Sequence, residues 1–198
     1  LELEAVATKS TLLHHAVSNE LLDLVQTLLA NGADPNLNVP VAASFGTPLL
    51  CAADSGNNAI VTALLNADAD PNRASSLFFD DIRNSRKGSP RAAEEGLQAS
   101  FIRPLWRAVQ LHHYYVVKTL LKHNADPNLT SYHPDLKSTT PLQISFPYAA
   151  LYRTMGPDLT SLVDARLRTT SICFKLLAAG ADPNAGDTTI IPPPLYSA

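Results

Sequence analysis

The chain has 198 residues, of which 45% are hydrophobic and 17% are charged, and its formal net charge is −3. This composition is typical of a globular domain, and the absence of an 18-residue apolar run or a signal-peptide pattern gives no indication of a membrane-spanning or exported protein. Two cysteines exclude a disulfide framework, so we expect an intracellular protein, cytoplasmic or nuclear, in which Cys51 and Cys173 are small core or near-core residues.

One tetrapeptide, Ala-Asp-Pro-Asn, occurs four times and defines an internal repeat. Its copies end at Asn36, Asn72, Asn128 and Asn184, at spacings of 36, 56 and 56 residues. The underlying unit is therefore about 33 to 37 residues long, and extra segments of roughly 20 residues are added in two places. A unit of this size cannot bury an apolar face alone, so the repeat predicts a stack in which neighbouring units share one core.

Each unit is expected to begin with a short helix. Thr11, Thr47 and Thr140 can cap the free amides of that helix through their hydroxyls. Pro48 and Pro141 then occupy the first helical position, where a missing N–H costs nothing.

A second helix follows in each unit, and its apolar residues come in pairs at i, i+1, i+4 and i+5. This spacing produces one apolar stripe on a helix. The stripes are Leu24, Val25, Leu28, Leu29; Ile60, Val61, Leu64, Leu65; Val116, Val117, Leu120, Leu121; and Ile172, Cys173, Leu176, Leu177. Each helix is followed by a residue type that tolerates the left-handed backbone that ends many helices, namely Gly32, Asp68, Asn124 and Gly180.

A second marker runs in phase with the tetrapeptide. It reads Thr11-Leu12-Leu13-His14-His15-Ala16, Thr47-Pro48-Leu49-Leu50-Cys51-Ala52, Arg103-Pro104-Leu105-Trp106-Arg107-Ala108 and Thr140-Pro141-Leu142-Gln143-Ile144-Ser145. Together the two markers resemble the ankyrin repeat family, in which Thr-Pro-Leu-His-x-Ala is followed by Gly-Ala-Asp-x-Asn. The resemblance implies an all-α, ankyrin-repeat solenoid of stacked helix-turn-helix units with finger loops and, here, two insertions.

We expect one ankyrin-repeat domain over residues 1–198. Its repeats lie at about 10–39, 40–72, 102–135 and 139–186, with a partial fifth at 187–198 and insertions at about 73–101 and 147–167. The chain begins without Met and stops inside a unit, so we expect it to be a fragment of a longer protein.

The first insertion contains the acid-free run Arg83-Asn84-Ser85-Arg86-Lys87-Gly88-Ser89-Pro90-Arg91. It is either a disordered surface loop or a contact arm that offers Arg83, Arg86, Lys87 and Arg91 to an acidic or phosphorylated partner.

The second insertion separates the two helices of the fourth unit. Pro147 should end the first helix, and Gly156-Pro157-Asp158 should cap a lengthened or doubled second helix that packs on the end of the stack or on a neighbouring domain of the same chain.

No catalytic, cofactor or metal site is predicted. His14 occupies a structural position of the family pattern, and the other five histidines have no cysteine or carboxylate partner at ligand spacing. The repeated Asp34, Asp70, Asp126 and Asp182 are expected to bond turn amides. The repeated asparagines are read as hairpin-stabilising side chains, although the family resemblance also allows their hydroxylation.

The resemblance implies a non-catalytic protein-protein interaction scaffold that binds through its concave face of finger loops and first helices. The third unit departs most from the pattern, because Arg103 replaces the capping Thr and Trp106 replaces the His, and we expect a hot spot there. The candidate partner-binding residues are Ser18, Asn19, Asp54, Ser55, Arg83, Arg86, Lys87, Arg91, Ile102, Arg103, Trp106, Arg107, Gln110 and Leu111.

Charge is polarised along the chain. Residues 1–72 contain eight acids and one base, Lys9, a net charge of −7, whereas residues 73–198 contain ten acids and fourteen bases, a net charge of +4. This pattern is explained either by drift on a solvated surface or by a protein or peptide partner of matching polarity.

Two other functions stay open. The first is a reader of a peptide or methylated lysine, with an aromatic cage drawn from Phe101, Trp106, Tyr114 and Tyr115. The second is the regulatory domain of an enzyme whose catalytic part lies elsewhere. Nucleic acid and membrane partners are not indicated.

Overall fold

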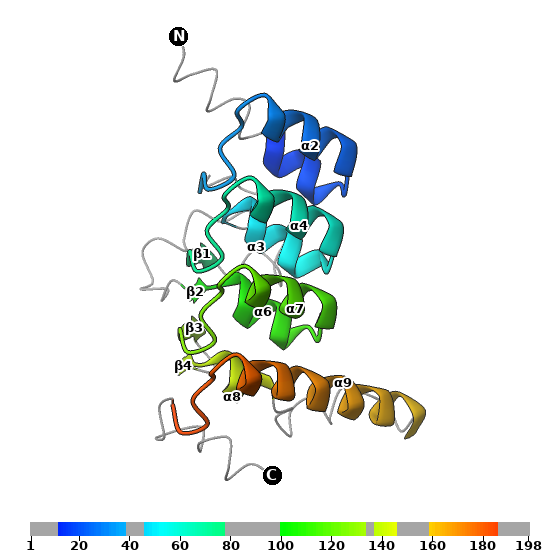
Figure 1. The fold of residues 1–198 in the computed structure, drawn as a ribbon, viewed down its shortest axis with the longest axis vertical. Coiled ribbons are helices and arrows are strands. Elements are labelled where there is room, and N and C mark those ends of the chain that lie inside the picture. Colours follow the sequence, from blue (N-terminus) through cyan, green and yellow to red (C-terminus); the bar gives the residue numbers. More distant parts are fainter. Residues whose placement is uncertain (1–11, 39–45, 78–99, 134–136, 146–158, 186–198) are drawn as a thin grey trace, which may run out of the picture.

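The computed structural model describes residues 12–38, 46–77, 100–133, 137–145 and 159–185, with the side chains of 76–77, 100, 133, 137 and 159–167 left out. Its helices form four successive pairs that stack along one axis (Figure 1). The pairs are residues 12–18 with α2 (Leu22–Ala30), α3 (Pro48–Ser55) with α4 (Asn58–Asn66), α6 (Pro104–Gln110) with α7 (Tyr114–Lys122), and α8 (Pro141–Ser145) with α9 (Leu159–Ala178). The predicted stack of helix pairs is therefore confirmed.

The predicted threonine caps are present where the structure describes them. Thr47 accepts the Leu50 N–H at 3.3 Å, and Pro48 follows it at the first position of α3. Thr140 and Gln143 form a reciprocal cap: the Gln143 N–H bonds Thr140 Oγ1 at 3.2 Å, and the Thr140 N–H bonds Gln143 Oε1 at 3.0 Å. Arg103 makes no side-chain cap on α6.

The predicted helix stops are also confirmed. Gly32, Asp68, Asn124 and Gly180 have φ angles of 80°, 62°, 63° and 87°. Four separate positions thus reverse the chain in the left-handed region and return it towards the finger loops.

The core is a continuous layer between helix pairs. Ile60, Leu64 and Leu120 are fully buried because each has a helix pair on both sides. Leu24 of the first unit and Leu177 of the fourth are each 44% exposed. The apolar stripe is therefore covered only where a neighbouring unit lies against it.

The two cysteines are placed as expected and lie beside serine hydroxyls. Cys51 is buried with its Sγ 3.4 Å from Ser18 Oγ, and Cys173 is half-buried with its Sγ 3.1 Å from Ser145 Oγ. Burial raises the pKa of both thiols above the ordinary value of 9.0. Both therefore stay protonated near neutral pH and are poor nucleophiles.

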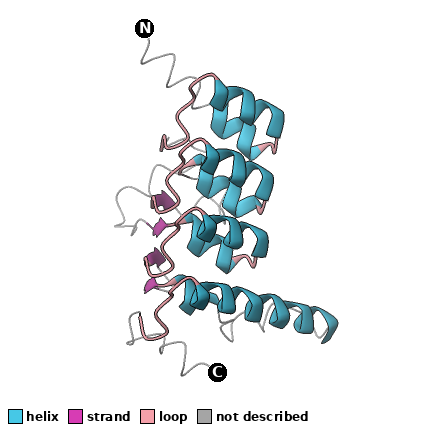
Figure 2. Cartoon of the chain, viewed as in Figure 1, coloured by secondary structure: helices cyan, strands magenta, loops and turns pink. Residues whose placement is uncertain are grey.

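The finger loops add a sheet that the all-α prediction did not include. Strands β1 (Ser75–Leu77), β2 (Ser100–Ile102), β3 (Ser131–His133) and β4 (Lys137–Thr139) pair antiparallel in the order β1-β2-β3-β4. Figure 2 shows them in a column along one side of the helices. Each strand has three residues, which is too short to produce a recognisable alternating pattern in the sequence.

The sheet also corrects the limits of the first insertion. Ser75 is fully buried, and its hydroxyl accepts the Thr47 N–H at 3.1 Å. Residues 73–77 and 100–101 therefore belong to the finger hairpin, and the insertion is narrower than the expected 73–101. Its basic residues Arg83, Arg86, Lys87 and Arg91 lie outside the described residues, as does the expected fifth unit at 187–198.

The second insertion lengthens the second helix as predicted. Helix α8 ends at Ser145, before Pro147, and α9 begins at Leu159, directly after Gly156-Pro157-Asp158. Helix α9 has 20 residues, whereas α2, α4 and α7 have nine each. Its extra turns extend past the side of the stack that the other helices reach (Figure 1).

Candidate functional site

The repeated Asp and Asn residues lock one unit to the next. Asp34, Asp70, Asp126 and Asp182 each accept the N–H of the Asn two residues later at 2.8 Å. Three of these asparagines bond both a backbone carbonyl and a backbone N–H of the following unit, for example Asn36 Nδ2 with Asp68 O at 2.9 Å and Asn36 Oδ1 with the Asp70 N–H at 2.7 Å. The structural reading of these side chains is confirmed.

The His position of the repeat also contacts the next unit. His14 is buried and its Nε2 donates to Gly46 O at 2.9 Å, and Trp106 Nε1 donates to Thr139 Oγ1 at 2.8 Å from the corresponding position. In the second unit the same pair of positions holds Leu50 and Ile102, which pack against each other. Trp106 and Ile102 are 0% exposed, so their predicted role in partner binding is wrong: both are core residues.

Arg103 is likewise tied to the finger loops. Its Nε donates to Asn72 O at 3.2 Å, and its guanidinium also donates to Thr130 O. The residue is half-buried. Arg103 therefore joins the ends of two successive repeats instead of standing free as an anchor.

A charged cluster links the second and third units where their first helices end. Arg107 Nε lies 2.5 Å from Asp54 Oδ1, and Arg107 also donates to Gln110 Oε1 at 2.6 Å. The Arg107 side chain is 16% exposed and that of Asp54 is 40% exposed. Asp54 and Gln110 thus remain at the surface while Arg107 is held between the units.

The other predicted residues at these helix ends are exposed. We call the C-terminal ends of the first helices the inner rim, defined by Ser18, Asn19, Asp54, Ser55, Gln110 and Leu111. Asn19 bonds only His15 O within its own turn, and Leu111 is a large apolar side chain that is 36% exposed. The structure therefore brings six of the predicted residues to one edge of three successive units.

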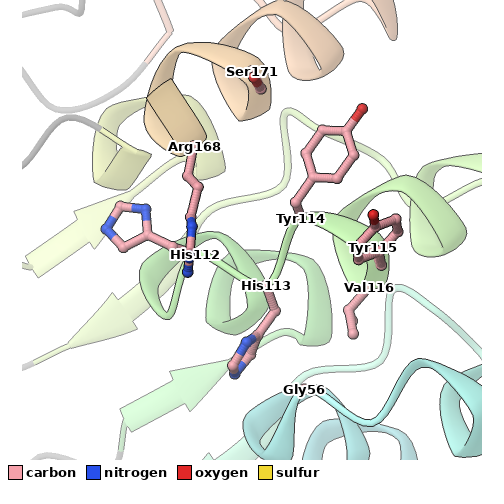
Figure 3. Close-up of a pocket in the computed structure, with 8 residues that line it drawn as sticks. All are labelled: Gly56, His112, His113, Tyr114, Tyr115, Val116, Arg168 and Ser171. Atoms are coloured by element: carbon pink, nitrogen blue, oxygen red, sulfur yellow. The ribbon is translucent and has the colours of Figure 1, made fainter. Parts of the chain in front are cut away.

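A groove that the sequence analysis did not predict lies beside the inner rim. It has a volume of about 540 Å³ and is lined by Gly56, His112, His113, Tyr114, Tyr115, Val116, Arg168 and Ser171 (Figure 3). The turn between α6 and α7 supplies the histidines, and α9 supplies Arg168. No spacing in the sequence connects these two segments, because the second insertion separates them.

Two protein-family models match this chain. A family model described as ankyrin repeats (3 copies) matches residues 3–75, and one described as ankyrin repeat matches residues 103–132. These matches cover more than half of the chain. The chain belongs to the ankyrin repeat family. No curated protein matches it.

The four aromatic residues of the expected methyl-lysine cage do not all come together in these ankyrin repeats. Tyr114 and Tyr115 meet edge to face with ring centroids 5.5 Å apart, but Trp106 is in the core and Phe101 lies on β2 with 52% of its surface exposed. The four residues do not form the common cage that a methyl-lysine reader would need.

The described part of these ankyrin repeats has neither a metal-ligand cluster nor a membrane-spanning helix. There, no three His, Cys, Asp or Glu side chains come together as metal ligands. No described helix, including the 20-residue α9, has the length and apolar character needed to cross a bilayer.

Proposed function

We propose that this chain is the partner-binding module of a larger intracellular protein and that it holds a protein or peptide partner along the inner rim. Ankyrin repeats are generally protein-protein interaction modules. The observation that carries the proposal is the row of exposed rim side chains, which are not needed for the core and lie on three stacked units. A rigid scaffold with variable exposed ends is suited to recognition.

Charge supports a partner of mixed polarity. The described residues of the first two units contain six acids and no Lys or Arg. Residues 100–133, by contrast, contain four bases and one acid. The basic insertion precedes residues 100–133 in the sequence, and its Arg83, Arg86, Lys87 and Arg91 would meet acidic or phosphorylated groups of the partner.

The test is affinity capture from cell extract with the chain as bait, followed by kinetic measurement on the captured partner. Changing Arg83, Arg86, Lys87 and Arg91 together to Gln should slow association, and high salt should slow association of the wild type in the same way. Association rates that are unaffected by both changes would remove the basic insertion from the proposal and leave the inner rim.

The proposed domain includes a fifth unit at 187–198, and one buried side-chain amide supports the presence of that unit. Gln143 occupies the position from which His14 and Trp106 bond the next unit, and its Nε2 is buried with no hydrogen-bond partner among the described residues. A following unit would supply an acceptor at that point.

A further inference from the structure

The groove beside the inner rim is lined by one guanidinium, two imidazole rings and no acid. Arg168, His112 and His113 line it, and none of its eight lining residues is Asp or Glu. The nearest rim carboxylate, Asp54, is already paired with Arg107 at 2.5 Å. A cluster of this kind, with no internal counter-charge among the described residues, is suited to an anion from outside.

Arg168 and His112 each keep a nitrogen that the described residues leave open. Arg168 is exposed and makes no hydrogen bond or ion pair with a described side chain. In Figure 3 it extends from α9 towards the His112–His113 turn. The Nδ1 of His112 lies 3.5 Å from Thr169 Oγ1, which leaves Nε2 for a ligand. Guanidinium and imidazolium groups are the donors that bind phosphate oxygens most strongly.

The ring of His113 is held at the groove by the second unit. Its Nε2 lies 3.1 Å from Asp54 O, and because a carbonyl only accepts, Nε2 must carry the proton. The ring lies against Gly56, where an added Cβ would be 2.7 Å from two ring atoms. Gly56, with φ of 76°, has no Cβ and therefore leaves room for the His113 ring beside the groove.

The start of α7 makes a smaller favourable contribution to anion binding in the groove. Asn57 caps α4 by accepting the Ile60 N–H at 3.2 Å, whereas the corresponding residue of α7, His113, makes no side-chain cap. The first amides of this nine-residue helix therefore face the same region with their positive partial charge.

We propose that this groove binds a phosphate monoester carried on a phosphorylated side chain of a partner protein, an inference that rests on the proposed function. Arg168 offers a planar fork to two phosphate oxygens, and the Nε2 of His112 supplies a further contact. The groove is wide enough to admit the carrying side chain, with Tyr114 and Tyr115 on its wall. The Arg168 guanidinium would repel a methylated lysine.

The experiment follows the imidazole signals of the folded chain by NMR during titration. The probes are inorganic phosphate, phenyl phosphate, and glycine-flanked peptides that contain phosphotyrosine or phosphoserine, each with its unphosphorylated counterpart. We expect saturable shifts of the His112 and His113 signals with a phosphopeptide, and binding tighter than that of inorganic phosphate.

Two variants of α9 distinguish a specific phosphate-binding site from general electrostatic attraction to positively charged side chains. Arg168→Gln should weaken phosphopeptide binding about tenfold or more because it removes a charge-assisted fork. Lys175→Gln removes an equal charge from an exposed position of α9 outside the groove and should leave binding unchanged. Circular dichroism of both variants checks that α9 is intact, and Arg168→Lys, which keeps the charge, should fall between them.

Three results would overturn the proposal: shifts that do not saturate, equal losses in the two glutamine variants, or phosphopeptides that bind no more tightly than inorganic phosphate. The last result would indicate a small phosphorylated molecule as the ligand. A rim variant, Ser55→Arg with Leu111→Arg, should retain phosphopeptide binding. Failure of this site is thereby distinguished from failure of the inner rim to bind a partner.

Discussion

Trp106 donates its indole N–H to the hydroxyl of Thr139 over 2.8 Å, from the position at which His14 donates to the Gly46 carbonyl over 2.9 Å. The two donors differ in size and chemistry, yet both bond the residue that precedes the cap of the next unit. The pair Leu50 and Ile102 meets the same need with apolar contact. Three different pairs of residues therefore close the junctions between units at the same two positions.

The first prediction tests that pairing. Thr139→Val should destabilise the chain by about 1 to 3 kcal/mol, because the buried Trp106 N–H loses its acceptor in Thr139. Thr130→Val, at an exposed position, serves as the control and should change little. Urea unfolding of both variants gives the comparison, and equal midpoints would show that the indole bond is not needed.

The second prediction concerns two glycines with left-handed backbone. Gly46 has φ of 71°, and an added Cβ would lie 2.2 Å from Ser75 Cβ, whereas Gly32 has φ of 80° and open space around it. Gly32→Ala should cost about 1 to 2 kcal/mol through backbone strain alone. Gly46→Ala should cost a further 1 to 3 kcal/mol or so from the clash with Ser75. Similar melting temperatures for the two variants would contradict the placement of Ser75 under the Thr47 cap.

The third prediction separates the insertion from the hairpin that bears it. Replacing residues 78–99 by a short Gly-Ser turn should change the free energy of unfolding by less than about 1 kcal/mol, because loop length has a weak entropic effect. Replacing residues 73–99 instead removes β1 and the Ser75–Thr47 bond and should lower the melting temperature clearly. If the shorter replacement abolished the helical circular dichroism signal, residues 78–99 would belong to the core.

The fourth prediction is a pH dependence. Burial, Arg168 and His113 lower the pKa of His112 below its ordinary value of 6.5. The unfolded chain then binds the proton more strongly than the folded chain, so this contribution to stability is complete above about pH 6.5 and is lost as the pH falls below it. His112→Asn, which suits the φ of 57° at this position, should flatten the loss.

The control for this prediction is His15→Asn, which changes an exposed ring. Melting temperatures of the three proteins should be measured from pH 7.5 to 5. A wild type that is as stable at pH 5.5 as at pH 7, or an unchanged slope in His112→Asn, would contradict the assignment.

The limits of the helices could be predicted from the sequence because they depend on local residues. Helix limits followed from Thr47, Pro48 and the four left-handed stops, because caps and stops act within one turn of chain. The long α9 followed from Pro147 and Gly156-Pro157-Asp158 for the same reason. These features depend on neighbours in sequence, so the sequence was sufficient to predict them.

Features that depend on contact across units were not predicted. Trp106 is a typical hot-spot residue by type, but its burial depends on Thr139 in the next unit. The sheet depends on pairing such as that between Phe101 and Tyr132, 31 positions apart. The groove depends on Arg168, which the second insertion brings back to the turn at His112. No periodic spacing in the sequence indicates these contacts.

Binding of a partner to the inner rim is tested most directly by quantitative capture with two matched variants. Ser55→Arg with Leu111→Arg places two bulky cations on the rim, and Gln26→Arg with Asn66→Arg places the same charge on exposed positions of the second helices α2 and α4. The rim variant should lose the partners that the wild type retains from cell extract, and the second-helix variant should keep them. Equal retention by both variants, or loss only in the second-helix variant, would contradict the claim.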